Sequence, residues 1–372
     1  MIKILMLGWE YPPYMKGGLG THCYNLLNEL KKHKNLKIYF LNPHPIHKKD
    51  ENLEVIGLDI TQKYKEDGKI LSYGNYLNEK EEEYNIKAAA VASKLNFDLI
   101  HCQDRMPIDA AIKIKKESNK PLIVTIHSTE FDKSKKPRKK RMNKEIRGMI
   151  AADKIIAISD YTKGVMINKL KINKKKMVVI GNGVDHGKIV SKNDAKIKYI
   201  LSLGRLTYQK GITYLIEAMV KVSKEDDNAR LLIAGEGDND KYSRKLRSIV
   251  KKNKLDKYVS FLGFVPNRAT YYKKAYIFVM PSYSEPFGIT PLEALSYGTP
   301  SIISKQSGIA KYYKNCLKVD YWDTDKLAKK IVFLLKNRKE YEKLRDKAIT
   351  ELKNFTWKKV AEKTISLYKN MI

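Results

Sequence analysis

The strongest constraint on the fold is an alternation, repeated along the whole chain, of short apolar runs with longer helical stretches. Runs such as KILML, KIYFLN and PLIVTIHS are too short for helices, and helical candidates such as THCYNLLNELKKH separate them. Strand-like runs that alternate with helices are typical of a parallel sheet covered by helices on both faces. The alternation therefore predicts an α/β protein.

The alternation restarts after a polar stretch near residues 185–197, which we interpret as a domain boundary. The second half then contains the strand candidates YILSLGR, ARLLIAGEG, YVSFLGF, YIFVMPS, TPSIIS and CLKVD. A chain of 372 residues suits two domains of ordinary size. We expect two Rossmann-like doubly wound domains, residues 1–190 and 191–354, which face each other across a cleft, and a final helix in residues 355–372. Ligands of such sheets bind beyond the carboxyl ends of the strands.

The charge distribution argues against a nucleic-acid partner, although the formal net charge is +32. Residues 1–190 hold 36 basic and 22 acidic residues, and the remainder holds 37 and 19, so the excess is spread evenly. No interleaving of aromatic and basic residues is present. One run, Lys133–Lys144, has eight basic residues in twelve and no acid. It is either a solvated surface loop or a basic arm that attracts anionic lipid headgroups or a phosphorylated acceptor.

The cysteines and the apolar runs indicate a soluble protein of a reducing compartment. Cys23, Cys102 and Cys316 are odd in number and widely spaced, without the spacing of a disulfide framework or a zinc site. No segment approaches the roughly 18 to 20 apolar residues of a membrane span. The first apolar run is too short for a signal peptide. We expect a cytoplasmic protein, with peripheral contact to anionic membranes if the basic run binds them.

The segment SEPFGITPLEAL carries two glutamates, Glu285 and Glu293, around a turn and a helix start. Thr290 suits an N-cap, Pro291 suits the first helical position, and Glu293 then falls three residues after the cap. This capping box explains Glu293 by structure alone, so a structural and a functional role remain equally open for that residue.

Glu285 has no comparable structural explanation. It precedes Pro286, which holds it extended in a loop just after an apolar strand. Gly288 lets a ligand approach the backbone, and the amides before Thr290 would face an anion favoured by the helix dipole. A carboxylate beside an anion is explained if Glu285 accepts hydrogen bonds from the hydroxyls of a sugar attached to that anion.

Two other segments supply cations and glycines. SLGRLTYQKG places Arg205 and Lys210 after the first strand of the second half, as a solvated basic loop or as a clamp on a diphosphate. In the first half, WEYPPYMKGGLGTH forms a turn before a helix that contains Lys16, Gly17, Gly18 and Gly20. This turn is a weak signal, since it fits neither the P-loop nor the dinucleotide pattern.

Taken in order along nearly the whole chain, these motifs resemble those of the retaining glycosyltransferases of the GT-B fold, family 4, and of the related glycogen and starch synthases. KGGLG resembles their N-terminal donor loop, HCQD their His-x-x-Asp segment and VTIHSTEFD their active-site histidine strand. VIGNGVD resembles the close of the first domain, with Gly181 where the family usually has proline. GRLTYQKG and the Glu-x7-Glu segment are the most specific matches, and FTWKKVAEKTISLYKNMI resembles the family's last helix.

The resemblance implies a role for each site residue. Arg205 and Lys210 would stabilise the leaving nucleoside diphosphate in place of a metal, Glu285 would contact the donor sugar, and His127 would face the reacting sugar. The first domain would hold the acceptor and the second the donor, with the last helix packed back on the first domain. The implied donor site consists of Lys16, Gly17, Gly18, Phe287, Gly288, Ile289, Thr290 and Glu293.

The resemblance implies transfer of a hexosyl group from an ADP-, UDP- or GDP-linked donor with retention of configuration, without a further cofactor. The acceptor stays open among a glycan, a lipid-linked sugar and a small sugar. Two alternatives also stay open: a sugar-nucleotide epimerase of the same fold, and a non-catalytic protein that binds polyanions or membrane surfaces. The non-catalytic alternative predicts a clustered basic face and does not require Glu285.

Some polar residues have structural explanations. We expect Asp238 and Asp240 in GDND to cap a helix rather than bind a metal. His22, His101 and His127 are too scattered to predict a metal site. His101 and Cys102 close a buried strand, and Asp104 has either a functional or a helix-capping role.

Overall fold

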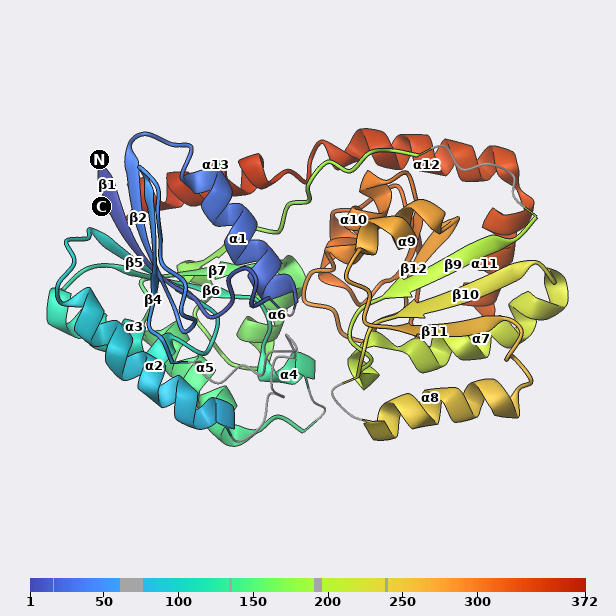
Figure 1. Cartoon of the computed structure of the whole chain (residues 1–372), viewed down its shortest axis with the longest axis horizontal. Coiled ribbons are helices and arrows are strands. Elements are labelled where there is room, and N and C mark those ends of the chain that lie inside the picture. Colours follow the sequence, from blue (N-terminus) through green and yellow to red (C-terminus); the bar gives the residue numbers. More distant parts are fainter. Residues whose placement is uncertain (16, 61–75, 134–135, 191–195, 238–239) are drawn as a thin grey trace. The chain divides into compact units, whose positions relative to one another are not determined.

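The computed structural model contains two compact units, Met1–Gly183 with Trp357–Ile372, and Val184–Thr356. Figure 1 shows a sheet with helices in each unit. The structure describes residues 1–15, 17–60, 76–133, 136–190, 196–237 and 240–372. The final helix therefore belongs to the same unit as the first half of the chain.

The first unit is built on an eight-stranded sheet in the order β3-β4-β2-β1-β5-β6-β7-β8. All neighbouring strands are parallel except β3 and β4. Every residue of β5 and β6 is buried, as expected for a parallel sheet covered on both faces. The strands are β1 (Ile2–Leu7), β2 (Leu36–Asn42), β3 (Lys48–Lys49), β4 (Leu53–Gly57), β5 (Leu99–Gln103), β6 (Leu122–Ile126), β7 (Lys154–Ala157) and β8 (Met177–Val179).

Helices cover this sheet on both sides (Figure 1). Because side chains alternate along a strand, Ile4 and Met6 of β1 lie in one core with residues of α1 and α13, whereas Leu5 and Leu7 lie in the other with residues of α2 and α3. The helices are α1 (Gly18–Leu30), α2 (Tyr76–Ala92), α3 (Ile108–Ser118), α4 (Glu130–Lys133), α5 (Lys139–Ala151), α6 (Asp160–Asn168) and α13 (Trp357–Lys369), with a 3-10 turn η1 (Lys174–Lys176).

The second unit has a six-stranded, fully parallel sheet in the order β11-β10-β9-β12-β13-β14. Its strands are β9 (Lys198–Leu203), β10 (Ala229–Ala234), β11 (Val259–Gly263), β12 (Ile277–Met280), β13 (Ser301–Ser304) and β14 (Leu317–Val319). Its helices are α7 (Ile212–Glu225), α8 (Asp240–Lys252), α9 (Arg268–Lys274), α10 (Thr290–Ser296), α11 (Thr324–Lys336) and α12 (Arg338–Leu352), with 3-10 turns η2 (Tyr208–Lys210) and η3 (Gly308–Lys311).

In both sheets, the order in which the chain adds strands reverses at one point. In the first, the chain moves outward from β1 and returns to β5 on its other side. In the second, it moves outward from β9 and returns to β12. In doubly wound sheets, ligands bind at this switch, beyond the carboxyl ends of the two strands. The predicted α/β class with two parallel, doubly wound sheets is confirmed, and the topology singles out the segments after β1, β5, β9 and β12.

The second part of the basic run, Lys139–Lys144, is helical, in contrast to the surface loop that was one interpretation of its composition. Lys133 ends α4, and the residues from Lys139 to Lys144 form the first turns of α5; Lys135, with its neighbour Ser134, lies outside the described residues. Lys144 is buried, with its Nζ 2.5 Å from Glu81 Oε1 and 2.8 Å from Asp109 Oδ2. Later residues of α5, such as Met149, pack into the core and hold this part of the run in a helix.

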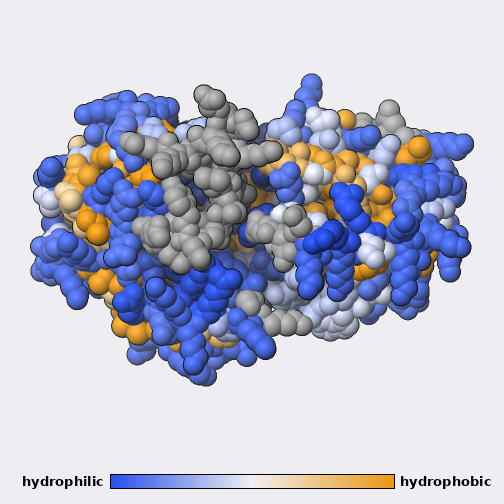
Figure 2. Space-filling view, turned by 60° about the horizontal axis from the view of Figure 1, so that its bottom comes forward, coloured by the Kyte–Doolittle hydropathy of each residue, from blue (hydrophilic) through white to orange (hydrophobic). Residues whose placement is uncertain are grey.

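Figure 2 shows one face of the molecule, and hydrophilic residues cover most of its coloured part, with apolar patches between them. Among the described helices, none combines the length and the apolar character needed to traverse a bilayer. Cys23, Cys102 and Cys316 are all buried free thiols.

Candidate functional site

The centre of the candidate site is an ion pair between Lys210 and Glu285. Lys210 ends η2, just after β9, and Glu285 lies in the loop after β12, the strand next to β9. Lys210 Nζ donates to Glu285 Oε2 at 2.5 Å, and the two side chains are 25% and 11% exposed. The sequence pointed to both residues, and the structure brings them into direct contact at the switch point of the sheet.

The backbone around Lys210 holds its loop close to the loop of Glu285. Gly211 has φ +66°, and a Cβ there would lie 2.0 Å from Pro281 O, so only glycine fits. Tyr283 N donates to Gln209 O at 3.0 Å. Arg205 is exposed on the same loop.

The segment that follows Glu285 is fixed by pairing with the loop after β13. Gly308 N donates to Glu285 O at 2.8 Å, and Ile309 N donates to Phe287 O at 2.7 Å. Gly288 has φ +103°, and a Cβ there would lie 2.9 Å from Met280 Cε. The positive φ and the packing against Met280 together require a glycine at this position.

The predicted capping box at α10 is wrong. The N-cap is Ile289, and no side chain caps the helix; the Thr290 hydroxyl lies 3.9 Å from Met280 Sδ instead. Ile289 O accepts from the N–H groups of Leu292 and Glu293, which closes the first turn by backbone bonds alone. Since Pro291 has no N–H, the amides that can face an anion are those of residues 287–290.

Glu293 is therefore held by other partners. Its Oε2 accepts from Tyr272 OH at 2.6 Å, and its Oε1 lies 3.8 Å from Arg268 Nη1. The carboxylate is 19% exposed. It can accept a further hydrogen bond, as a ribose contact requires.

In the first unit, the Gly-rich turn is organised by Glu10, which the sequence did not single out. Gly17 is the N-cap of α1, and Gly18 is its first residue. Glu10 Oε2 accepts from Gly20 N at 3.1 Å and from Gly17 N at 3.4 Å. A Cβ on Gly20 would lie 2.6 Å from that oxygen. A buried carboxylate thus holds the amides of this helix start, while the predicted Lys16 lies outside the described residues.

His127 follows β6 and is almost fully buried. Its Nε2 lies 2.9 Å from Gln103 Oε1, and its ring centroid is 4.5 Å from that of His22. Burial, helped by the nearby His101 and Lys133, lowers the pKa of His127 to about 3, so the ring is neutral near pH 7. His101 and Cys102 are fully buried in β5, as expected.

Asp104 follows β5 directly, in a left-handed conformation with φ +64°. It does not cap α3, whose N-cap is Pro107. Its Oδ1 is buried and has no hydrogen-bond partner among the described residues, and burial raises the pKa of this carboxyl. Glu130 and Glu145, both buried, each have one such oxygen as well.

In the described residues, no group of three or more metal-binding side chains is close enough to hold an ion. Asp238 lies outside those residues, as does the side chain of Asp240, so their predicted capping role stays a prediction.

Glu145 makes a pH-dependent contribution to stability. Burial raises its pKa from 4.5 to about 7. The folded state therefore binds more protons than the unfolded state between these values, and stability falls as the pH rises through this window. We expect Glu145→Gln, which can still accept from Glu130 N, to be more stable than the parent at pH 8, by at most about 3 kcal/mol.

Urea unfolding at pH 5 and pH 8 measures this difference. The advantage of Glu145→Gln should be much smaller at pH 5, and the exposed Glu117→Gln should show none at either pH. An equal change at both pH values would contradict the assignment.

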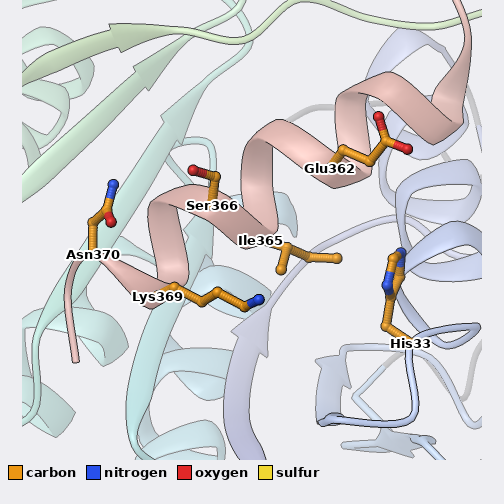
Figure 3. Close-up of a pocket in the computed structure, with 6 residues that line it drawn as sticks. All are labelled: His33, Glu362, Ile365, Ser366, Lys369 and Asn370. Atoms are coloured by element: carbon orange, nitrogen blue, oxygen red, sulfur yellow. The ribbon is translucent and has the colours of Figure 1, made fainter.

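A pocket of about 320 Å³ lies elsewhere in the first unit, beside α13. Figure 3 shows its lining: His33, Glu362, Ile365, Ser366, Lys369 and Asn370. His33 precedes β2, so this pocket is at the amino ends of the strands. It is therefore separate from the carboxyl-end segments that carry Glu10, Asp104 and His127.

Comparisons with known proteins agree with this fold. The family described as Glycosyltransferase Family 4 matches residues 16–188, and the family described as Glycosyl transferases group 1 matches residues 184–351. An uncharacterized glycosyltransferase of Methanocaldococcus jannaschii is 29% identical, over 99% of this chain and 98% of its own length. A glycogen synthase of Mycobacterium tuberculosis is 24% identical, over 83% of this chain and 80% of its own.

A solved structure shares this fold. HepE from Anabaena, solved in complex with UDP and glucose, is 16% identical and superposes with a TM-score of 0.79 over the whole of both chains. The family matches together span residues 16–351. The chain therefore belongs to the GT-B glycosyltransferases of family 4 and is similar to glycogen synthase.

Proposed function

We propose that this glycosyltransferase moves a hexosyl group from a nucleoside-diphosphate sugar to a glycan, a lipid-linked sugar or a small sugar, with retention of configuration and without a metal. The observation that carries the proposal is the Lys210–Glu285 pair at the switch point between β9 and β12. A cation and a carboxylate in contact suit a ligand that joins a phosphate to a hydroxylated ring. The complex of HepE with UDP and glucose supports a donor of this class.

In this proposal the diphosphate binds beside Lys210 and Arg205, and the amides of residues 287–290 add hydrogen-bond donors. Glu285 accepts from hydroxyls of the donor sugar, Glu293 binds the ribose, and His127 faces the reacting sugar. Gly17 and Gly18, at the start of α1, are further donor contacts in this proposal. When the bond from the anomeric carbon to the phosphate oxygen breaks, its electron pair stays on the diphosphate, where fixed cations stabilise it.

A binding and turnover experiment tests the proposal. Thermal unfolding is measured with ADP-, UDP- and GDP-sugars, because selective binding raises stability by RT ln(1 + [L]/Kd). The stabilising donor is then incubated with and without candidate acceptors, and NMR identifies the anomer formed. Release of nucleoside diphosphate only with an acceptor supports transfer. Sugar isomerisation without acceptor would indicate an epimerase, and no stabilisation by any donor would favour a non-catalytic protein.

We expect activity to survive an excess of EDTA. Lys210, Arg205 and backbone amides provide the positive charge that a metal provides in other transferases. The measurement is turnover before and after chelation, with added Mg²⁺ or Mn²⁺ as the control. Complete loss that either metal restores would contradict the metal-independent mechanism.

We also propose that the basic residues before and at the start of α5 contact an anionic acceptor or membrane surface. Lys136, Arg138, Lys139 and Lys140 are exposed there. We expect Lys136→Gln/Lys139→Gln/Lys140→Gln to weaken binding to phosphatidylglycerol vesicles. The loss should be largest at low salt, since the Debye length is about 30 Å at 0.01 M and about 8 Å at 0.15 M.

The control removes the same charge from α12, where Lys339, Lys343 and Lys347 are exposed. Sedimentation with vesicles measures both variants at the two salt concentrations. Equal losses for the two variants would mean that only net charge matters. Unchanged vesicle binding and acceptor kinetics would show that the α5 residues are merely solvated.

A further inference from the structure

A series of buried, hydrogen-bonded polar side chains runs from α13 along β5 to His127, which follows the neighbouring strand β6. Tyr368 OH lies 2.6 Å from His101 Nδ1, and Gln103 Nε2 lies 3.2 Å from His101 Nε2. Gln103 Oε1 then lies 2.9 Å from His127 Nε2. Tyr368, His101 and Gln103 are fully buried. No water can replace these contacts without a cavity, so each group depends on its neighbour.

The two contacts of the Gln103 amide determine which atom donates and which accepts in each of these hydrogen bonds. An amide has one accepting and one donating end. With Oε1 toward His127, the His127 Nε2 carries its proton and donates it. With Nε2 toward His101, the His101 Nε2 is bare and accepts, and the Thr125 hydroxyl, 2.7 Å away, donates to the same nitrogen. His101 Nδ1 then carries the proton and donates to Tyr368 OH.

The reverse direction would require Gln103 to turn by half a rotation and both imidazoles to exchange tautomers. The sulfur of Met6 disfavours this reversed orientation of the Gln103 amide. In the observed orientation, Gln103 Nε2 also donates weakly to Met6 Sδ at 3.7 Å. In the reverse orientation, a carbonyl oxygen would face that sulfur and gain no hydrogen bond.

This arrangement leaves the other nitrogen of His127 available. Within the described part of the chain, His127 Nδ1 has no hydrogen-bond partner, while Nε2 is committed to Gln103. The titratable groups that act on this ring come from several elements: His22 of α1, His101 of β5 and Lys133 of α4. The Asp104 carboxyl, after β5, interacts instead with the backbone N–H of His127. Both neighbouring imidazoles and the ring itself are buried, which favours neutral forms throughout.

We infer that Gln103 is a positioning residue that holds neutral His127 in the Nε2–H tautomer and leaves Nδ1 bare, as an acceptor for a substrate hydroxyl. This inference deepens the proposed function and rests on it only for the identity of the hydroxyl. It assigns His101 and Met6, which contact the Gln103 amide, the role of fixing its orientation, whereas Tyr368 lies one contact further away, on His101. His127 would then accept, and not donate, the hydrogen bond at the reacting sugar.

Nitrogen NMR of the ligand-free protein tests the tautomer without any assay of activity. Isotope-labelled histidine gives well-separated shifts for protonated and bare ring nitrogens, and His127→Gln assigns the signal. We expect His127 to be protonated at Nε2 and bare at Nδ1, and His101 to show the opposite pattern. A wild-type spectrum with His127 protonated at Nδ1 would overturn the inference, whatever the enzyme transfers.

Two substitutions then test the role of Gln103. Gln103→Met keeps the length of the side chain but cannot donate and accepts only weakly through its sulfur, so the His127 tautomers should mix. We expect kcat to fall roughly 10- to 100-fold, because a loosened catalytic group loses its orientation, with a smaller change in donor KM. Gln103→Glu still accepts from Nε2–H, and its carboxylate stabilises a doubly protonated ring. Its kcat should fall mainly at low pH, with the acid limb of the pH profile moved to higher pH.

Tyr368→Phe is the matched control. It also breaks a buried hydrogen bond of this series and should lower the unfolding temperature, as Gln103→Met does. It leaves the Gln103–His127 contact in place, so the His127 tautomer and kcat should change much less. Similar losses of kcat in both variants, or an unchanged His127 tautomer in Gln103→Met, would reduce Gln103 to a structural residue.

Discussion

Replacing Lys210 by alanine should lower turnover roughly 100- to 1000-fold, the range found when one donor to a developing anion is removed. The leaving diphosphate gains negative charge as the sugar departs, and Lys210 is the cation that the structure places at the switch point beside Glu285. Since this stabilisation grows in the transition state, the loss should fall on kcat more than on donor KM. Steady-state kinetics with saturating acceptor measure it.

The ion pair complicates this variant in a way that the sequence did not reveal. Lys210→Ala leaves Glu285, whose side chain is only 11% exposed, without the cation that balances it. Removing one partner of a buried pair costs roughly 3 kcal/mol or more. A drop in stability could therefore imitate a loss of catalysis, and the two must be separated.

A double variant, Lys210→Met/Glu285→Gln, separates them because it removes both charges and keeps the volume. It should recover most of the stability lost in Lys210→Ala and none of the turnover. Arg205→Ala provides a second comparison, since this exposed residue should affect turnover with little change in stability. Near-native turnover in both Lys210→Ala and Arg205→Ala would show that the diphosphate clamp is wrongly assigned.

The fold could be predicted from the sequence because its signal is repeated. Each strand of a buried parallel sheet is a short apolar run, and each crossover needs a helix, so the alternation specifies the class many times over. The topology then determines which strand ends meet. Lys210 and Glu285 lie far apart in the sequence, yet both follow strands that are neighbours in the sheet. Their direct contact depends on side-chain packing, which the sequence pattern does not report.

The wrong capping box and the residues that the sequence analysis missed also reflect side-chain contacts made by the fold. Thr290 has the right residue type for a cap, but Ile289 O closes the first turn, and Tyr272 holds Glu293 from another helix. Glu10 and Gln103 were missed because no local pattern marks them. Each acts through a neighbour brought close by the fold, one through the amides of α1 and the other through His127. Only the position of Glu10, just before the glycine-rich turn, could have drawn attention to it.

Glu285→Gln should lower turnover by at least about 100-fold while nucleoside diphosphate binding holds or tightens. The amide keeps the size of the side chain but loses the charge that offsets positive charge near the anomeric carbon. It also releases Lys210 from its ion pair, so that the ammonium group can turn fully to the diphosphate. Calorimetry of nucleoside diphosphate binding and turnover at saturating donor measure the two effects separately.

Glu293→Gln is the matched comparison, with the same change of atoms in the same segment. Its side-chain oxygen can still accept from Tyr272 OH, and the long contact with the 40% exposed Arg268 contributes little, so stability should change by less than about 1 kcal/mol. A neutral acceptor binds ribose hydroxyls more weakly than a carboxylate, so donor affinity should fall more than turnover at saturation. Normal donor binding would leave Glu293 as a structural partner of Tyr272. Full turnover in Glu285→Gln would be the more serious result, because the pair at the switch point would then lose the role on which the proposed function rests.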